Sequence, residues 1–321
     1  MSSLLEAKHV KKYFKVPAGQ LHAVDDVSFS IDEGHTMGVV GESGCGKSTL
    51  GRVILRLLEP TAGKVIFEGK DLVQMDRHEM HKMRQKIQMI FQDPFSSIDP
   101  RMSVYDTIAE PLKIYQICKN PQEIRARVKE IMDTVGLAQR LMTSYPHELD
   151  GGRRQRIGIA RALILEPRFI VCDEPVSALD VSIQAQILNL MQDLQKERGL
   201  TYMFITHDLS VVRHISTAIC VMYLGEIVEM CPAKELFISA MHPYTQALLS
   251  AIPIPDITLK RQRILLKGEL SSPINPSPGC RFAPRCLYAT DQCRAQAPEF
   301  TEKAPGHYVA CHRCGGNNIA E

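Results

Sequence analysis

Residues 41–48 read GESGCGKS, and their types and spacing point directly to chemistry on a phosphorylated ligand. The spacing fits G-x-x-x-x-G-K-S/T, in which glycines let consecutive backbone N–H groups point at phosphate oxygens. The lysine can reach the β- and γ-phosphates of a nucleotide, and the following hydroxyl can bind Mg²⁺. We therefore predict an ATP site with Mg²⁺ at this loop. Its predicted binding residues are Gly41, Ser43, Gly44, Cys45, Gly46, Lys47, Ser48 and Thr49, with Ser48 also a Mg²⁺ ligand.

A second segment, FIVCDE at residues 169–174, presents two carboxylates after four apolar residues. The apolar run predicts a buried strand with Asp173 and Glu174 at its carboxyl end. Asp173 can complete the Mg²⁺ coordination, and Glu174 can orient or deprotonate an attacking water. Together with the loop at 41–48, this pair predicts nucleotide hydrolysis.

The elements that must position these residues follow from the apolar pattern. TMGVV (36–40), FIVC (169–172) and YMFIT (202–206) read as short buried strands. A helix is predicted after the loop at 41–48, and another from about 183 to 198, because apolar residues recur there at helical spacing. In the first of these helices the apolar residues are Leu50, Val53, Ile54, Leu57 and Leu58.

The rest of the chain divides into segments of different character. The first 30 residues alternate like antiparallel strands. Residues from about 100 to 165 read as helical, including a helix with Asn120 as its N-cap and Pro121 in its first turn. AICVMYLGEIVEM (218–230) is typical of a β-hairpin, and about the last 60 residues are loop-rich with few periodic signals.

The composition is that of an ordinary globular protein, with 321 residues, 45% of them hydrophobic and 23% charged. A formal net charge of +2 gives no case for a nucleic-acid partner, which usually needs a concentrated basic face. The chain contains no run of about 18 apolar residues that could span a bilayer. Its first residues lack the apolar stretch of a signal peptide. We therefore expect a cytoplasmic protein whose thiols stay reduced.

Four further motifs, taken with the two above, resemble the nucleotide-binding subunit of an ABC transporter over nearly the whole chain. LDGGRRQRIGIARAL (149–163) resembles the signature segment, and SALD (177–180) resembles the D-loop. His207 in FITHD resembles the switch histidine, and Gln92 in IFQDP resembles the Q-loop glutamine. Each motif alone is weak, but their order and spacing together are highly specific.

The resemblance implies a role for each motif residue. Glu174, His207 and Gln92 would be catalytic, and Gln92 would also contribute to the Mg²⁺ site with Asp173 and Ser48. An aromatic residue near the N-terminus would stack on adenine; Phe14 aligns best and Tyr13 is the rival. The signature residues would contact ATP bound by the other subunit of a dimer; they are Leu149, Asp150, Gly151, Gly152 and Arg153. The D-loop residues are Ser177, Ala178, Leu179 and Asp180.

The fold implied by the resemblance is of the α/β class. It is a P-loop, ABC-type nucleotide-binding domain with an antiparallel β subdomain, a helical subdomain at about 93–165 and a small Cys-rich C-terminal tail. We expect the nucleotide-binding domain to cover residues 1–240 and the C-terminal extension to cover residues 241–321.

The signature departs from the family pattern Leu-Ser-Gly-Gly-Gln at Asp150 and Arg153. Asp150 would place a negative charge beside the γ-phosphate; at about 4 Å the repulsion is roughly 1 kcal/mol in water and about 4 kcal/mol at an effective dielectric of 20. Arg153 could offset part of this by pairing with Asp150 or the phosphate, or Asp150 could simply cap its helix. We therefore expect a heterodimer with a related ABC ATPase subunit, in which the site that uses this signature is degenerate.

Two segments of the tail narrow the resemblance. MHPYTQALLSAIP (241–253) and GELSSPINPSPGCRFAPRC (268–286) resemble the tail of the dipeptide/oligopeptide importers, which also covers some metal-chelate importers. This implies import of peptides or related small solutes at the cytoplasmic face of the membrane, with two transmembrane permease subunits and an extracytoplasmic substrate-binding protein. The alternative is a soluble ABC ATPase of translation or DNA repair, which usually carries two cassettes or long coiled-coil inserts; this chain has neither.

Five cysteines of the tail have the spacing C-x5-C-x6-C-x17-C-x2-C. Zinc sites favour close pairs, which only Cys311 and Cys314 form, whereas iron–sulfur clusters need four thiolates but tolerate varied spacing. Spacing alone leaves an iron–sulfur cluster, Zn²⁺ and unliganded thiols open. The importer resemblance implies a 4Fe–4S cluster, with Cys314 as a spare or a competitor for Cys311. The implied ligands are Cys280, Cys286, Cys293 and Cys311.

Overall fold

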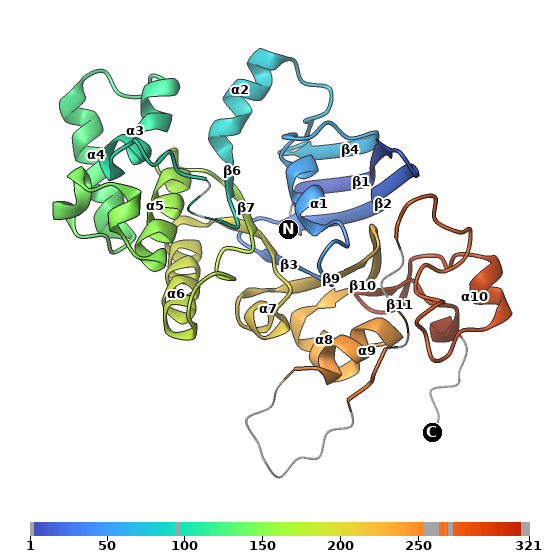
Figure 1. Cartoon of the computed structure of the whole chain (residues 1–321). Helices are drawn as coiled ribbons and strands as arrows, with labels where there is room; N and C mark the ends of the chain where they lie inside the picture. Colours follow the sequence, from blue (N-terminus) through green and yellow to red (C-terminus); the bar gives the residue numbers. More distant parts are fainter. Residues whose placement is uncertain are drawn as a thin grey trace, which may run out of the picture. The chain divides into compact units, whose positions relative to one another are not determined.

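The computed structural model describes most of the chain, namely residues 3–93, 95, 97–252, 263–266, 268 and 272–315. Outside the described residues lie 253–262, 267, 269–271 and 316–321 of the predicted C-terminal extension, and 94 and 96 of the predicted helical subdomain. The described residues form two compact units. Figure 1 labels most of their helices and strands. The phosphate-loop unit contains Ser3–Ile31, Thr36–Val73 and the described residues from Thr206 onward, and the helical unit contains Asp32–His35 and Gln74–Ile205. The boundary expected between residues 240 and 241 stays a prediction.

The phosphate-loop unit begins with a four-stranded sheet in the order β2-β1-β4-β5. β1 pairs with β4 and β4 pairs with β5, both antiparallel. In β2, Val27, Phe29 and Ile31 are buried whereas Ser28 and Ser30 between them are not, so alternate residues face the core, as the sequence pattern predicted. The strands are β1 (Ser3–Val16), β2 (Gly19–Asp32), β4 (Ala62–Phe67) and β5 (Lys70–Asp71).

A second group of strands in this unit has the order β11-β12-β10-β9-β3. β3 runs parallel to β9, and β9 and β10 form the hairpin predicted at 218–230. Every residue of β3 is buried, which is typical of a parallel strand covered on both faces. The strands are β3 (Thr36–Val40), β9 (Ala218–Tyr223), β10 (Glu226–Pro232), β11 (Thr301–Ala304) and β12 (His307–Val309).

The helix that follows the loop at 41–48 is shorter than predicted. It begins at Lys47 but ends at Ile54, so Leu57 and Leu58 are not part of it. Arg56 has a positive φ of 49°, a left-handed conformation that an α-helix does not accommodate, and Leu57 is exposed. The helices of this unit are α1 (Lys47–Ile54), α7 (Leu209–Ile215), α8 (Ala233–Ser239), α9 (Pro243–Ser250) and α10 (Asp291–Ala295), with a 3₁₀ turn η3 (His312–Gly315).

The tail is more ordered than its loop-rich sequence predicted. β12 pairs antiparallel with β10, so the tail extends the sheet. Phe282 is buried against the rings of Tyr223, Tyr244 and His242, with ring centroids 5.2, 5.5 and 5.5 Å away. The tail therefore shares the core of the phosphate-loop unit.

The helical unit contains three parallel strands in the order β8-β7-β6. Every residue of β7 and β8 is buried, as predicted for 169–172 and 202–206. The side chain of Asn120 caps α4 as predicted, by accepting from the Glu123 N–H. The strands are β6 (Ile87–Ile90), β7 (Phe169–Asp173) and β8 (Thr201–Ile205). The helices are α2 (Arg77–Lys86), α3 (Val104–Ile114), α4 (Pro121–Thr134), α5 (Gly151–Leu163) and α6 (Val181–Arg198), with 3₁₀ turns η1 (Gln139–Thr143) and η2 (Pro146–Glu148).

Among the residues that the structure describes, no helix is both long enough and apolar enough to span a membrane. Even α6, with 18 residues, carries Lys196 and Arg198 in its last turn.

Candidate nucleotide site and cysteine pocket

The phosphate loop, residues 41–48, connects β3 to α1 in the phosphate-loop unit. Two of its glycines have positive φ angles and neighbours that leave no room for a side chain. At Gly41 (φ 153°) an added Cβ would lie 2.2 Å from the Met222 carbonyl oxygen. At Gly46 (φ 105°) it would lie 2.0 Å from the Ala23 carbonyl oxygen. Only glycine allows both the backbone angle and this close approach.

Lys47 is buried at the first position of α1. Its ammonium donates hydrogen bonds to the carbonyl oxygens of Gly41 at 2.8 Å and Glu42 at 2.9 Å. The charged group is thus held within the loop, at the N-terminus of a helix, where phosphate groups are favourably bound. This geometry agrees with the predicted role of the loop in binding a polyphosphate.

The other residues of the phosphate loop differ in exposure. Ser43 and Gly44 form an exposed tip, whereas Ser48 and Thr49 are half-buried in the first turn of α1. Cys45 is buried, and burial raises the pKa of its thiol, which therefore stays protonated near neutral pH. The ATP-binding residues predicted from this segment all lie at one strand–helix junction.

In the helical unit, two predicted catalytic residues are in direct contact. Gln92 Nε2 donates to Glu174 Oε2 at 2.9 Å, beside Asp173, the buried last residue of β7. Glu174 has φ 45°, a left-handed conformation that costs a non-glycine residue about 1–2 kcal/mol. Its N–H donates to the Ile205 carbonyl oxygen at 2.9 Å, which holds this conformation in place. Such strain in an ordered residue is often found at functional sites.

His207 belongs to the phosphate-loop unit and lies between β8 and α7 in the chain, with its side chain exposed. The next residue, Asp208, caps α7 by accepting from the Ser210 N–H at 2.7 Å. This cap fixes the turn that carries His207. The predicted catalytic residues are therefore divided between the two units.

The signature segment begins α5 in the helical unit, with Asp150 as the N-cap. Asp150 Oδ1 accepts from the Arg153 N–H at 2.8 Å, and the Arg153 guanidinium lies 3.3 Å from Asp150 Oδ2. The helix cap and the ion pair considered for Asp150 are thus both present. Leu149 and Gly152 are buried, and a Cβ on Gly152 would approach Ile183 to 2.8 Å.

The D-loop leads into α6, whose N-cap is Asp180. Ser177 Oγ donates to the Glu174 carbonyl oxygen at 3.1 Å. Leu179 lies against Gly151, where an added Cβ would be 3.2 Å from its Cδ2 atom. Within the helical unit the D-loop therefore contacts both the signature segment and the residue that carries the predicted catalytic carboxylate.

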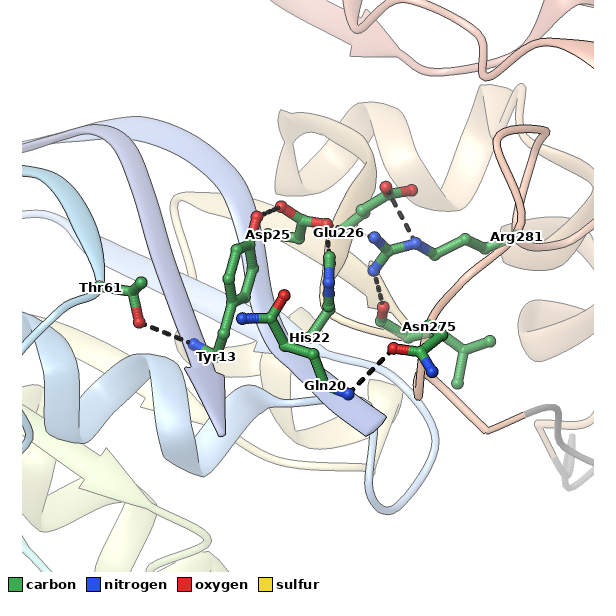
Figure 2. A network of polar contacts seen from close by, with 9 residues as sticks. Tyr13, Gln20, His22, Asp25, Thr61, Glu226, Asn275 and Arg281 are labelled. Carbon is green, nitrogen blue, oxygen red and sulfur yellow. Dashed lines mark hydrogen bonds and ion pairs between the residues drawn. The ribbon is translucent and has the colours of Figure 1, made fainter. Parts of the chain in front are cut away.

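The two aromatic candidates for adenine, Tyr13 and Phe14, are neighbours on β1 and so face opposite sides of the strand. Tyr13 stacks on His22 with ring centroids 4.0 Å apart, and its hydroxyl donates to Asp25 (Figure 2). Burial and this hydrogen bond raise the pKa of Tyr13. Phe14 contacts Lys12, whose Nζ lies 5.0 Å from the ring centroid. Because the ring and hydroxyl of Tyr13 are both engaged, Phe14 is the better candidate.

The cysteines predicted to bind a cluster line one pocket of the phosphate-loop unit. Phe282 and Tyr288 also line it. Cys314 is not part of the lining, and its Sγ lies 3.5 Å from the Met241 carbonyl oxygen. The four lining cysteines are Cys280, Cys286, Cys293 and Cys311.

The thiols of this pocket have different proton affinities. Burial raises the pKa of Cys280 to about 11 and also raises that of Cys286. A hydrogen bond from Cys314 lowers the pKa of Cys311. Among the described residues, no group of three or more His, Cys, Asp or Glu side chains has the arrangement of a metal site. The pocket therefore has sulfur donors on its wall but no preformed coordination sphere.

Two arginines beside these cysteines have contacts that the sequence analysis missed. Arg285 forms a two-point ion pair with Glu42 of the phosphate loop, at 2.6 and 3.1 Å, which raises the pKa of Arg285. Arg281 forms ion pairs with Asp25 and Glu226 (Figure 2). The sequence does carry a signal for these ion pairs. Each cysteine of GCRFAPRC has an arginine next to it, and the phosphate loop contains an acidic residue.

Comparisons with known proteins agree with the motifs and with the fold. Residues 24–177 match the family described as ABC transporter, and residues 228–293 match the family described as oligopeptide/dipeptide transporter, C-terminal region. The second match includes β10 from residue 228, helices α8 and α9, and three of the four pocket cysteines. The match to two families in this order covers both the phosphate loop and the tail.

Relatives align with nearly the whole chain. It is 51% identical over 320 residues to oligopeptide transport ATP-binding protein AppF of Bacillus subtilis, covering 97% of each chain. It is 53% identical over 308 residues to oligopeptide transport ATP-binding protein OppF of Salmonella typhimurium, covering 95% of this chain and 92% of that one. A dimeric ATP-binding cassette solved in a post-hydrolysis state with ADP and Pi is 31% identical, with a TM-score of 0.66 over 71% of this chain and 98% of the other.

We predict that Gly46→Ala abolishes ATP binding and lowers the free energy of unfolding by about 2 kcal/mol or more, because its Cβ would collide with the Ala23 carbonyl oxygen. Gly44→Ala is the matched control, since Gly44 also has a positive φ (79°) but no atom within 4 Å of the added Cβ. It should cost about 1 kcal/mol. Thermal unfolding and ATP titration measure both effects. Equal ATP affinities for the two variants would contradict this account of the loop.

Proposed function

Because this chain belongs to the ATP-binding subunits of ABC transporters, in the dipeptide/oligopeptide importer subfamily, we propose that its ATP hydrolysis powers the import of dipeptides, oligopeptides or related small solutes. The observation that carries the proposal is the match of the tail, in addition to the cassette, to oligopeptide transport proteins. The alternative of a soluble ATPase of translation or DNA repair is not favoured, since the named relatives align from end to end.

The chemical roles that we propose follow the contacts within each unit. Lys47 and the backbone N–H groups of the phosphate loop would bind the β- and γ-phosphates, and Phe14 would stack on adenine. Ser48, Gln92 and Asp173 would hold Mg²⁺, which neutralises phosphate charge when bound. Glu174 would accept a proton from the attacking water, with its carboxylate oriented by Gln92, and His207 would contact the γ-phosphate.

The partners that we propose are two transmembrane permease subunits, an extracytoplasmic substrate-binding protein and a second ATPase subunit. The chain would sit at the cytoplasmic face of the membrane as a peripheral subunit. The relatives' role in oligopeptide transport supports this assembly, because transport of a solute requires a membrane path that an ATP-binding protein does not supply.

We predict that Glu174→Gln in the assembled transporter lowers ATP turnover by about 10²-fold or more and stops peptide uptake, because glutamine keeps the shape of the side chain but cannot accept the proton. ATP affinity should stay close to that of the wild type. Phosphate release and uptake of a labelled tripeptide into vesicles measure the two activities. Glu299→Gln, an exposed change in the tail, is the control.

Two outcomes of this experiment would contradict different parts of the proposal. Wild-type turnover in Glu174→Gln would remove Glu174 from the reaction. Hydrolysis could instead be lost in the variant while the wild-type complex shows no peptide-dependent ATPase activity. That result would keep the assignment as an ATPase but exclude peptide import.

We further propose that the ATPase dimer is a heterodimer in which the site using this signature is degenerate. The contacts of Asp150 support this. Asp150 places a carboxylate at the N-terminus of α5, and this charge would repel the γ-phosphate of ATP bound by the other subunit. The Asp150 carboxylate is exposed to solvent, so its ion pair with Arg153 offsets this charge only in part.

We predict that Asp150→Ser combined with Arg153→Gln raises the turnover of the assembled complex, by about twofold if the second site becomes fully active. Serine still caps α5, so the helix should remain stable. Asp291→Ser with Arg294→Gln is the matched control, because that pair has the same i,i+3 spacing in α10. Unchanged turnover in the signature variant would rule out the asymmetry, and phosphate release measures it.

We also propose that the four pocket cysteines hold a 4Fe–4S cluster. The donor set fits this group, because four thiols line one pocket and cysteine thiolates are the ligands of such clusters. Two of the thiols come from the loop Cys280–Cys286, one from α10 and one from the segment after β12. When bound, a cluster would crosslink these segments. Zn²⁺ is the alternative, but its close pair needs Cys314, which lies outside the pocket lining.

We predict about four iron and four acid-labile sulfide per chain in protein purified without oxygen. Cys293→Ser should lower both contents, whereas Cys314→Ser should leave them unchanged because Cys314 does not line the pocket. Metal and sulfide analysis of the three proteins is the measurement. One Zn²⁺ per chain, lost in Cys314→Ser, would replace the cluster with a zinc site.

A further inference from the structure

The loop between the first two pocket cysteines, Cys280 to Cys286, carries two arginine side chains into the interior of the phosphate-loop unit. Arg281 and Arg285 are each only 8% exposed. Buried arginines in proteins are retained where each has a charged or hydrogen-bonding partner. Both arginines have such partners on the elements that form the nucleotide site.

Arg285 contacts the phosphate loop directly. Its two terminal nitrogens bind the two carboxylate oxygens of Glu42 at 2.6 and 3.1 Å. Tyr244 of α9 binds the same loop residue, since its hydroxyl accepts from the Glu42 N–H at 2.8 Å. The carbonyl oxygen of Glu42 in turn accepts from the ammonium of Lys47. Three hydrogen bonds from the tail region thus meet on the residue that helps hold the phosphate-binding lysine.

Arg281 contacts other elements of the phosphate-loop unit, namely β2 and β10 (Figure 2). Its guanidinium donates hydrogen bonds to the Asp25 carboxylate and to the Leu224 carbonyl oxygen. Asp25 also accepts a hydrogen bond from the hydroxyl of Tyr13. Its Nε lies 3.0 Å from Glu226. Tyr13 precedes the predicted adenine-stacking residue on β1. The same short loop is therefore fastened both to the phosphate loop and, through Asp25, to β2 and to Tyr13 of β1.

Phe282 fixes the direction of both arginines. It lies between them in sequence and is buried in the cluster of Tyr223, Tyr244 and His242. The backbone of the loop is therefore anchored by packing, and each end of the loop is a pocket cysteine. A change in the position of Cys286 must move Arg285, because the two residues share a peptide bond.

The contact between Arg285 and Glu42 should affect ATP binding because Glu42 is charged. A carboxylate inside a phosphate-binding loop repels a polyanionic ligand, and the repulsion grows in a partly desolvated site. A two-point pair with a buried guanidinium neutralises the carboxylate and fixes its direction.

We propose that Arg285 is a positioning residue of the ATP site, holding Glu42 and thus the phosphate loop, and that the loop Cys280–Cys286 links the state of the pocket cysteines to ATP affinity. The second part rests on the proposed cluster, whereas the first rests on the ATPase alone. Neither arginine needs to touch the nucleotide for this effect.

The first experiment compares ATP binding by the full-length chain with Arg285→Ala and Arg294→Ala. Arg294 is a matched control, since it lies in the same tail but its ion pair with Asp291 is exposed. Arg285→Ala should weaken ATP binding about tenfold, or ~1.4 kcal/mol, with turnover at saturating ATP changed less than about twofold. Arg285→Lys should recover part of the affinity. Unchanged affinity in Arg285→Ala would overturn the proposal.

Two further variants separate positioning from general loss of stability. Tyr244→Phe deletes one hydroxyl from a buried ring and should weaken ATP binding about threefold without unfolding the protein, because it removes one hydrogen bond to the loop. In Glu42→Gln, the change Arg285→Ala should have little added effect on affinity, since the two act through one contact. Equal effects of Arg285→Ala in both backgrounds would overturn the assignment of Glu42 as its target.

The link to the cysteines is tested with Cys286→Ser. In the wild type this change should weaken ATP binding, and in Arg285→Ala it should add nothing. Additive effects would exclude the link. Iron and sulfide content, measured on the same samples, separates this inference from the proposed cluster. Wild-type protein without iron would refute the cluster, and weaker ATP binding by Arg285→Ala in that same preparation would still support the positioning role.

Discussion

The nucleotide site depends on a backbone-to-backbone contact between the phosphate loop and the strand β2. Gly46 lies so close to the Ala23 carbonyl oxygen that no side chain fits between them. Two hydrogen bonds extend this contact: the Asp25 N–H donates to the Gly225 carbonyl oxygen, and the Gly225 N–H donates to the Cys45 carbonyl oxygen, each at 2.8 Å. Loop, strand and hairpin turn are therefore locked together before any ligand binds. The orientation of the first turn of α1, and of Lys47 within it, follows from this packing.

Local sequence signals were sufficient to predict the strands that adjoin the predicted site residues. Short apolar runs predicted β3, β7 and β8 because parallel strands are buried on both faces. The cap at Asn120 was predictable for the same local reason, since donor and acceptor are three residues apart. The early end of α1 could not be predicted, because the residue with positive φ that follows it is Arg56 and not the glycine or asparagine that usually marks such a position. Nor could β12, whose three residues acquire strand geometry by pairing with β10.

The same division applies to the site. Motif residues such as Lys47 and Glu174 could be singled out from the sequence, because the roles predicted for them, phosphate binding and water activation, need fixed residue types at fixed short spacings. Both alternatives for Asp150 were also visible, since its partner Arg153 is one helical turn away. The pair Glu42–Arg285 was not, because its members are 243 residues apart and neither has a characteristic local pattern. Contacts of this kind arise from the fold, so the sequence shows the charges but not their pairing.

A buried carboxylate extends the support of the phosphate loop still deeper into the phosphate-loop unit. Glu229 of β10 is fully buried and accepts from the backbone N–H groups of Met241 and His242 and from His307 Nε2. These bonds fix the start of α9, whose N-cap is His242, with Nδ1 accepting from the Tyr244 N–H at 3.1 Å. A ring nitrogen accepts only when it is unprotonated, and burial lowers the pKa of His242 to about 4, so the cap persists at neutral pH. Tyr244 then presents its hydroxyl to Glu42 from a fixed helix. The tail thus reaches the phosphate loop through a continuous set of buried contacts that begins at the sheet.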